Sequence, residues 1–344
     1  MKKVRWGVIG CGQISFDRAM PAMVKANNAE LAAVADIRPE RLEMARERFR
    51  DIALYTDHKE LLASDLDAVY IGLPNELHHP FTLEAAEHGK HVLCEKPLCI
   101  DAAEAYEMIT ACQKNNVKIM AAYMSRFGDA FQEAKRLIQG GRLGPIAMVN
   151  ANFSFAAWRG YTLDTPGSWR WTGMRGGPLL DAGIYVAFAV RELLGSRVKR
   201  VSANMSTVIA TDFPAHDTAI CWFELENGVP GVLTTTYSHA GSYFAVHGTD
   251  GTLTLDQAFA QRPTGKLVCR AHGYHLAYET DISQIDHFDN YRREIEHFSD
   301  AILNNSSYQP TPQDALNDMT FLDAIEESAD TGRVIKLAYA SVER

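Results

Sequence analysis

The chain has 344 residues, more than one hydrophobic core usually serves, so two domains are expected. Hydrophobic residues make up 47% and charged residues 22%, the ordinary balance of a globular protein. A formal net charge of -9 argues against nucleic acid or an anionic membrane as the main partner, whereas a small neutral substrate is compatible with it.

The sequence predicts no membrane span, signal peptide or metal site. No run approaches the roughly 18 apolar residues of a membrane span. The N-terminus enters a strand pattern almost at once, without the apolar stretch and cleavage site of a signal peptide. Cysteines are scattered, with no CxxC pair or Cys/His cluster, and several lie in apolar runs as reduced, buried thiols do. We therefore expect a cytoplasmic protein.

From Val4 to about Tyr123, short apolar runs alternate with amphipathic segments. The runs predicted as buried strands are VRWGVIG, ELAAVAD, AVYIGLP, HVLCEK and VKIMAAY. The segments predicted as helices include PERLEMARERF, PFTLEAAEHG and AAEAYEMITACQKN. This alternation is typical of a parallel, doubly wound sheet, and we assign residues 1–123 to such a domain. Right-handed crossovers bring every strand C-terminus to one edge, where these sheets bind ligands.

A glycine motif follows the first strand as Gly10-Cys11-Gly12-Gln13-Ile14-Ser15. Gly10 permits a tight turn, and Gly12 lets the backbone approach a pyrophosphate. Gln13 and Ile14 open the helix whose N-terminus can hold that pyrophosphate. The motif is weak alone, and a βα turn without a nucleotide is the alternative. Its position between a strand and a helix, with Asp36 ending the next strand, favours a dinucleotide site.

Asp36 bears on the choice of cofactor. A carboxylate can accept hydrogen bonds from both ribose hydroxyls and would repel a 2′-phosphate, which favours NAD. Arg38 lies two residues further on, and its guanidinium could bind that phosphate. Arg38 as a solvated cation at a helix start is an equally good interpretation. We expect NAD, with NADP left open.

Two more segments reach the same predicted sheet edge. The strand HVLC ends in Glu95-Lys96-Pro97, so we expect Glu95 and Lys96 to contact the cofactor, with Lys96 projecting toward the nicotinamide. A surface lysine is the alternative for Lys96. The strand AVYIGLP ends in Pro74 and is followed by Asn75 and His78, which we expect to contact the cofactor. Turn chemistry after proline is the alternative for Asn75. Nothing in the sequence tells whether His78 or its neighbour His79 faces inward.

After about Met124 the pattern changes to a helix (AFQEAKRLIQGG) followed by alternating strands. The predicted strands are IAMVNANFSF, VKRVSANMSTV, DTAICWFELENG, PGVLTTTYS, YFAVHGTDG and TLTLD. The turns ENG-VPG and TDG-TLT are hairpin signals and indicate an antiparallel sheet. Helices are predicted at roughly 178–194, 289–304 and 312–331. We assign residues 124–344 to this second, α+β domain.

An aromatic, arginine-rich stretch precedes the helix at 178–194. Sugar sites use aromatic rings and arginines, although a packed loop has the same composition. The candidate substrate residues are Arg159, Tyr161, Trp169 and Arg170.

The predicted helix at 178–194 carries a second pair of candidate residues. Asp181 and Tyr185 are four residues apart and therefore lie on one face of a largely apolar helix. Burying an acid and a phenol without partners costs free energy, so both groups need partners. The alternative is that Asp181 stabilises the helix N-terminus while Tyr185 only packs.

These residues together resemble the glucose-fructose oxidoreductase, inositol dehydrogenase and MocA family. The matching segments, which cover nearly the whole chain in the family's order, are GVIGCGQIS, Asp36, LPNELHHPFTLEAAEHGKHVLCEKPL, AYMSRF, GGPLLDAGIY, GTDGTLTLD and DAIEESADTGRVIKL. The resemblance implies a Rossmann domain that binds NAD(P). It also implies a second domain whose large, mainly antiparallel open sheet mediates homodimers or homotetramers. The implied reaction is hydride transfer to or from a sugar, polyol or related alcohol.

The resemblance also assigns roles to the candidate residues. Lys96 falls on the family's catalytic lysine, and Asp181 on the acid of its DxGxH motif. Tyr185 stands where histidine is commonest. That departure resembles the branch with glucose-fructose oxidoreductase, dimeric dihydrodiol dehydrogenase and some aldose dehydrogenases, and makes a histidine-based inositol dehydrogenase less expected.

The expected mechanism uses Tyr185 as proton donor and acceptor. A free phenol has a pKa near 10, and an ammonium within about 4–6 Å can lower an acidic partner's pKa by about 1–3 units. We therefore expect Lys96 to lower the pKa of Tyr185 and to hydrogen-bond the reacting oxygen, while Asp181 positions Lys96 or a substrate hydroxyl. The alternatives are a sugar–sugar oxidoreductase that never releases its cofactor and a non-catalytic NAD(P)-binding sensor. A purely structural oligomer would leave the glycines and Asp36 unexplained.

Overall fold

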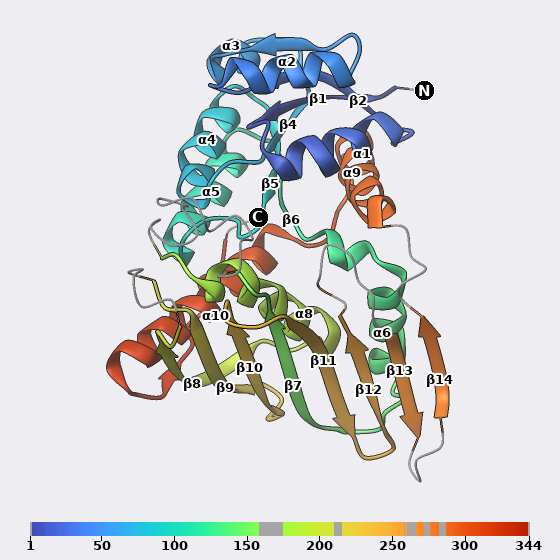
Figure 1. The fold of residues 1–344 in the computed structure, drawn as a ribbon, viewed down its shortest axis with the longest axis vertical. Helices are drawn as coiled ribbons and strands as arrows, with labels where there is room; N and C mark the ends of the chain where they lie inside the picture. Colours follow the sequence, from blue (N-terminus) through green and yellow to red (C-terminus); the bar gives the residue numbers. More distant parts are fainter. Residues whose placement is uncertain are drawn as a thin grey trace.

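The computed structural model describes residues 2–157, 175–209, 215–257, 259, 266–271, 276–281 and 287–342. Two sheets organise them (Figure 1). The first has six parallel strands in the order β3-β2-β1-β4-β5-β6. Their bounds are β1 Val4–Ile9, β2 Ala29–Ala35, β3 Ala53–Tyr55, β4 Ala68–Ile71, β5 His91–Glu95 and β6 Ile119–Ala122. This order confirms the predicted doubly wound sheet, with its switch point between β1 and β4.

Helices follow the strands of this sheet. They are η1 Ser15–Ala19, α1 Met20–Lys25, α2 Pro39–Arg48, α3 His58–Leu62, α4 Asn75–Glu87 and α5 Ala102–Lys114. Helices on both faces explain why β1 and β4 are almost entirely buried and read as continuous apolar runs. The carboxyl ends of β1, β4 and β5 therefore meet at the edge where the sequence predicts a ligand.

The second sheet has nine strands in the order β14-β13-β12-β11-β7-β10-β9-β8-β15. It is antiparallel except where β7 pairs with β10, which confirms the predicted α+β architecture. The strands are β7 Ile146–Ser154, β8 Val198–Ser206, β9 Thr218–Leu225, β10 Pro230–Thr236, β11 Gly241–Gly248, β12 Gly251–Asp256, β13 Lys266–Ala271, β14 Leu276–Asp281 and β15 Ile335–Lys336. Strict alternation of buried and exposed residues in β9 reflects a sheet covered on one face only.

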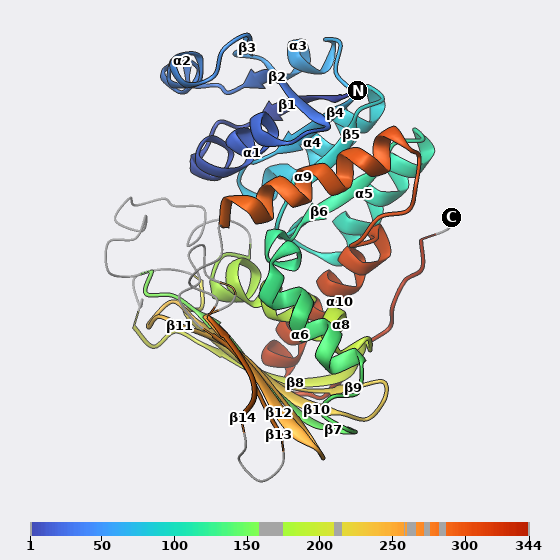
Figure 2. The ribbon, with the colours of Figure 1, turned by 90° about the vertical axis from the view of Figure 1, so that its right-hand side faces the viewer.

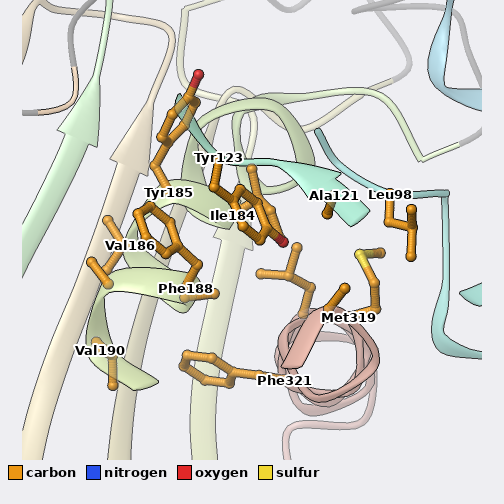
Figure 3. Close-up of a cluster of buried hydrophobic side chains, with 14 of the residues drawn as sticks. Leu98, Ala121, Tyr123, Ile184, Tyr185, Val186, Phe188, Val190, Met319 and Phe321 are labelled. Atoms are coloured by element: carbon orange, nitrogen blue, oxygen red, sulfur yellow. The ribbon is translucent and has the colours of Figure 1, made fainter. Parts of the chain in front are cut away.

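Helices on the inner face of this sheet separate it from the first domain (Figure 2). The helical elements after β6 are η2 Met124–Phe127, α6 Asp129–Gln139, η3 Leu179–Gly183, α8 Ile184–Leu194, α9 His287–Leu303 and α10 Pro312–Thr331. Helix α8 is buried along nearly its whole length, and Phe188 stacks on Tyr123 with ring centroids 4.7 Å apart (Figure 3). The helix that carries Tyr185 is thus fixed between the two domains.

Helix α9 returns to the first domain, although it follows the second sheet in the chain. Figure 2 shows it lying along the six-stranded sheet beside α1. Trp6 Nε1 donates to Ser299 Oγ at 3.1 Å, and Asn28 Nδ2 donates to the Glu296 carbonyl at 2.8 Å. The predicted division at 123–124 falls between β6 and η2, but α9 packs with the first domain.

Candidate active site

The glycine turn after β1 leaves open backbone where the sequence predicts a dinucleotide. Gly10 has φ +91°, and a Cβ there would lie 2.6 Å from the Gly72 carbonyl oxygen. At Gly12 a Cβ would meet only that same oxygen, at 3.8 Å, so protein packing does not require a glycine there. The backbone at Gly12 is therefore open to the approach of a ligand, which fits the role predicted for this glycine. Gln13 is exposed and Ile14 partly exposed in the first turn that follows.

Asp36 directly follows β2 beside this turn, with both carboxylate oxygens engaged. Oδ2 accepts from the Cys11 N–H at 2.8 Å, and Oδ1 accepts from the Arg38 N–H at 2.9 Å. The Arg38 side chain adds Nε to Oδ1 at 3.1 Å and Nη2 to Oδ2 at 3.2 Å. Although burial opposes ionisation, the hydrogen bonds from Arg38 and Cys11 lower the pKa of Asp36. Arg38 is half-exposed and could swing from this carboxylate to a phosphate.

Glu95 closes β5 and is held by the first domain. Tyr70 donates its hydroxyl to one carboxyl oxygen, and the Lys96 N–H donates to the other at 3.1 Å. Burial raises the pKa of Glu95, against the effect of Tyr70 and Lys96. Glu95 was predicted as a cofactor contact, but both of its carboxyl oxygens accept hydrogen bonds from within the protein.

His78 was expected to contact the cofactor, and the structure gives it another role. It is fully buried in α4, with Nδ1 2.8 Å from the Pro97 carbonyl and Nε2 2.9 Å from the Leu73 carbonyl. Burial lowers the pKa of His78, against the effect of the two carbonyls, and a neutral ring donates its single N–H to only one of them. The side chain thus joins the turn after β4 to the Lys96-Pro97 segment. Pro74 and Asn75 lie at the start of α4, where Asn75 is buried.

Lys96 meets the helix of the second domain as the sequence predicts. Its Nζ donates to Oδ1 and to the backbone carbonyl of Asp181, at 2.9 Å each. The same Nζ lies 4.8 Å from the ring centroid of Tyr185. Asp181 belongs to the π-helical turn η3, a form of helix frequent at functional sites, and Tyr185 to α8 directly after it. Asp181 is therefore paired with Lys96, as one of the two roles considered for it requires.

The surroundings of Tyr185 correct the predicted electrostatics. Burial raises the pKa of Tyr185 well above 10, and the nearby carboxyls of Glu95, Asp181 and Glu294 raise it further. The ammonium of Lys96 lies over the ring face and is already bound to Asp181, so the predicted lowering is not seen. Figure 3 shows the Tyr185 hydroxyl pointing away from the hydrophobic cluster, whose rings include Phe188. Tyr185 is thus a protonated phenol with its hydroxyl directed out of the core.

Several residues of the site were not found from the sequence. Tyr237, directly after β10, donates to Asp181 Oδ2 at 2.9 Å. Phe153 on β7 packs edge-on against Tyr185 with centroids 5.1 Å apart. Glu294 and Tyr291 on α9 are buried close enough to Glu95 for its charge to raise the pKa of each, after the larger effect of burial. Each of these belongs to an element far along the chain, with no local motif to mark it.

The candidate substrate residues Arg159, Tyr161, Trp169 and Arg170 lie outside the described residues. The described chain resumes at Arg175, whose guanidinium pairs with Asp323 at 2.6 Å and with Glu326 at 2.5 Å. Arg175 is therefore attached to α10.

Comparison with known proteins gives matches over most of the chain. Residues 4–123 match an oxidoreductase family described by its NAD-binding Rossmann fold, and residues 131–254 match the GFO/IDH/MocA C-terminal domain. D-xylose 1-dehydrogenase (NADP(+)) 2 of Haloferax volcanii is 32% identical, covering 96% of this chain and 99% of that protein. A dTDP-3,4-didehydro-2,6-dideoxy-α-D-glucose 3-reductase of Actinomadura kijaniata is 27% identical over 95% of this chain and 96% of its own.

A solved structure is similar over the full length. The aldose-aldose oxidoreductase from Caulobacter crescentus, complexed with glycerol, superposes with a TM-score of 0.88 at 29% identity. The superposition covers 98% of this chain and 100% of that one. The similarity therefore includes both domains and the arrangement between them.

Proposed function

Because the chain belongs to the GFO/IDH/MocA oxidoreductase family, we propose that it transfers a hydride between NAD(P) and a sugar or polyol, with Tyr185 as the proton donor and acceptor. The observation that carries this proposal is the meeting of Lys96, Asp181 and Tyr185 across the two domains. Family relatives support the substrate class, since they include a D-xylose dehydrogenase and an aldose-aldose oxidoreductase.

The nicotinamide, when bound, supplies the hydride chemistry, and the protein supplies position and proton transfer. Tyr185 holds a proton on its hydroxyl oxygen and can donate it to a carbonyl oxygen of the substrate. Lys96, oriented by Asp181, keeps a positive charge beside that oxygen, where it stabilises developing negative charge. Alcohol oxidation requires Tyr185 to accept a proton, so the phenol must first be ionised.

For the cofactor we propose a preference for NAD, with NADP also accepted. Gly10, Gly12 and the adjoining Gln13 and Ile14 would hold the pyrophosphate, and Asp36 the adenosine ribose. Arg38 neutralises Asp36 in the free protein, which weakens the repulsion that a 2′-phosphate would meet. The relative from Haloferax volcanii is named an NADP(+) enzyme, which supports the proposal that NADP is accepted as well as NAD.

A sugar–sugar oxidoreductase with a permanently held cofactor is a second candidate. The likeness to the aldose-aldose oxidoreductase favours it. Stoichiometric nucleotide released from the purified, denatured protein would support this candidate. Protein purified free of nucleotide would instead support an ordinary dehydrogenase that releases its cofactor after each turnover.

The outer face of the nine-stranded sheet supports the proposed homodimer or homotetramer. Cross-strand pairing puts Met148, Ile220, Trp222 and Tyr243 on this one face, each substantially exposed. Exposed apolar side chains of this size on one face are typical of protein–protein contacts. Light scattering coupled to gel filtration measures the assembly.

The six cysteines, all free and buried, support the proposed reducing, cytoplasmic compartment. No helix among the described residues is long and apolar enough to cross a membrane.

A screen of aldoses, polyols and their carbonyl products, with NAD and NADP in parallel, tests the proposed function. We expect turnover with at least one aldose or polyol and a ratio of kcat/KM that favours NAD. Cofactor binding without turnover on any member of the panel would instead support the sensor.

A further inference from the structure

Tyr237 directly follows β10, and its side chain is fully buried. Its hydroxyl lies 2.9 Å from Asp181 Oδ2 and 3.2 Å from the Gly177 carbonyl. A hydroxyl has one hydrogen to donate, and a carboxylate is the stronger acceptor of the two. The stronger bond therefore goes to Asp181.

The two oxygens of Asp181 have different partners. Oδ2 faces Tyr237, while Oδ1 accepts from Lys96 Nζ at 2.9 Å. The carboxylate thus connects the second sheet with the first domain. Rotation of the carboxylate would break both bonds together, so the bond from Tyr237 restricts the direction in which Oδ1 can hold Lys96.

Tyr237 is itself held from several sides. Its N–H donates to the Asp217 carbonyl at 2.9 Å, and its carbonyl accepts from the Ala157 N–H at 3.0 Å. Its ring packs on Phe155 with centroids 4.9 Å apart. The hydroxyl is therefore in place before any substrate arrives, as an orienting group must be.

We propose that Tyr237 is a positioning residue of the reaction: it fixes the carboxylate of Asp181, which holds the Lys96 ammonium beside Tyr185. This role rests on the proposed function. Tyr237 acts through Asp181, so its effect on turnover must vanish when Asp181 can no longer form the ion pair with Lys96.

A double-mutant cycle tests this dependence, using wild type, Tyr237→Phe, Asp181→Asn and the double variant. Phenylalanine keeps the ring contact with Phe155 and removes only the hydroxyl. We expect Tyr237→Phe to lower kcat about tenfold in the wild-type background and less than about twofold beside Asp181→Asn. We expect KM and the Kd for NAD to stay within about twofold of the wild-type values. Tyr106→Phe, at an exposed position of α5, is the matched control and should leave kcat unchanged.

The outcomes separate this inference from the proposed function. The same loss of kcat in both backgrounds, or no loss in either, would overturn the positioning role while leaving the dehydrogenase intact. A lower Tm with unchanged kcat would likewise overturn it, because the hydroxyl would then serve the fold alone. A wild-type protein that turns over no member of the sugar panel would refute the proposed function, and this role with it.

Discussion

Lys96 and Asp181, 85 residues apart in the sequence, form an ion pair across the two domains with Nζ 2.9 Å from Oδ1. A second bond of the same length joins Nζ to the Asp181 backbone carbonyl. Because the Asp181 backbone belongs to the buried η3–α8 segment, the ammonium is held by a rigid part of the second domain. This pair fixes the charge beside Tyr185 and so links the fold to the proposed chemistry.

The raised pKa of Tyr185 predicts opposite pH dependences for the two directions of the reaction. Oxidation needs the phenolate, so kcat for oxidation should rise up to tenfold per pH unit from neutral pH toward about pH 10. Reduction uses the protonated phenol and should stay flat over that range. Steady-state rates in both directions from pH 6 to about pH 10 provide the measurement. Oxidation that levels off below neutral pH would show that another group, or a lowered pKa, governs proton transfer.

Substitutions at Asp36 and Arg38 should shift nucleotide preference in opposite directions. Asp36→Ala removes the acceptor for the ribose hydroxyls, and we expect the Kd for NAD to rise about tenfold or more. Arg38→Ala removes the cation available to a 2′-phosphate, and the Kd for NADP should rise about tenfold while that for NAD changes little. Fluorescence titration with each nucleotide gives both constants. Equal losses for NAD and NADP in Arg38→Ala would contradict a role in their discrimination.

Glu294 should make the fold less stable as the pH rises. Glu294 is 1% exposed, and its Oε1 has no hydrogen-bond partner in the described part of the chain. Burial, then the charge of Glu95, raises the pKa of Glu294, so the native state holds this proton more tightly than the unfolded state. Stability is therefore lost as pH rises above the ordinary glutamate value of about 4.3.

Glu294→Gln removes that dependence. The free energy of unfolding of this variant minus that of wild type should increase by about 1 kcal/mol or more between about pH 5 and about pH 8. Thermal or urea unfolding at each pH gives the difference, and Glu87→Gln at an exposed position of α4 is the control. A difference that does not change with pH would mean that Glu294 ionises normally.

Arg191 should be essential to the stability of α8. Its guanidinium pairs with Asp318 at 2.8 Å and Asp314 at 2.9 Å, on α10. Arg191→Leu leaves the buried Asp318 carboxylate without this partner, and we expect a loss of about 3–5 kcal/mol by urea unfolding. Adding Asp318→Leu should restore part of that loss, because the unpaired charge is then gone. If the double variant is no more stable than Arg191→Leu, the loss of stability comes from the packing of the arginine side chain and not from the unpaired charge.

Local patterns in the sequence predicted the glycine turn after β1 and the helical segment that carries Asp181 and Tyr185. Gly10 and Asp36 follow strands with strong apolar character, so a parallel sheet brings them to one edge. The spacing of Asp181 and Tyr185 puts both on one helical face, and only their position relative to Lys96 needed the fold. Most second-domain strands were predicted from alternation. The strands β3, β13, β14 and β15 were not predicted, and β3 and β15 are too short to give a pattern.

Contacts between distant elements set the limit of prediction. Tyr237 and Glu294 reach the site from β10 and α9, and no periodicity marks either one. His78 was assigned to the cofactor because it follows a strand end, but α4 begins at Asn75 and turns the imidazole into the core. The pKa of Tyr185 was predicted from one cation, whereas burial and three carboxyls act against it.

We propose that Tyr185 transfers the proton while the rest of the site binds the cofactor. The most direct measurement compares kcat and the Kd for NAD in wild type and Tyr185→Phe, with the best substrate from the panel. We predict a fall in kcat of about a hundredfold to ten-thousandfold, with the Kd for NAD unchanged within about twofold. A kcat near the wild-type value would show that Tyr185 does not transfer the proton.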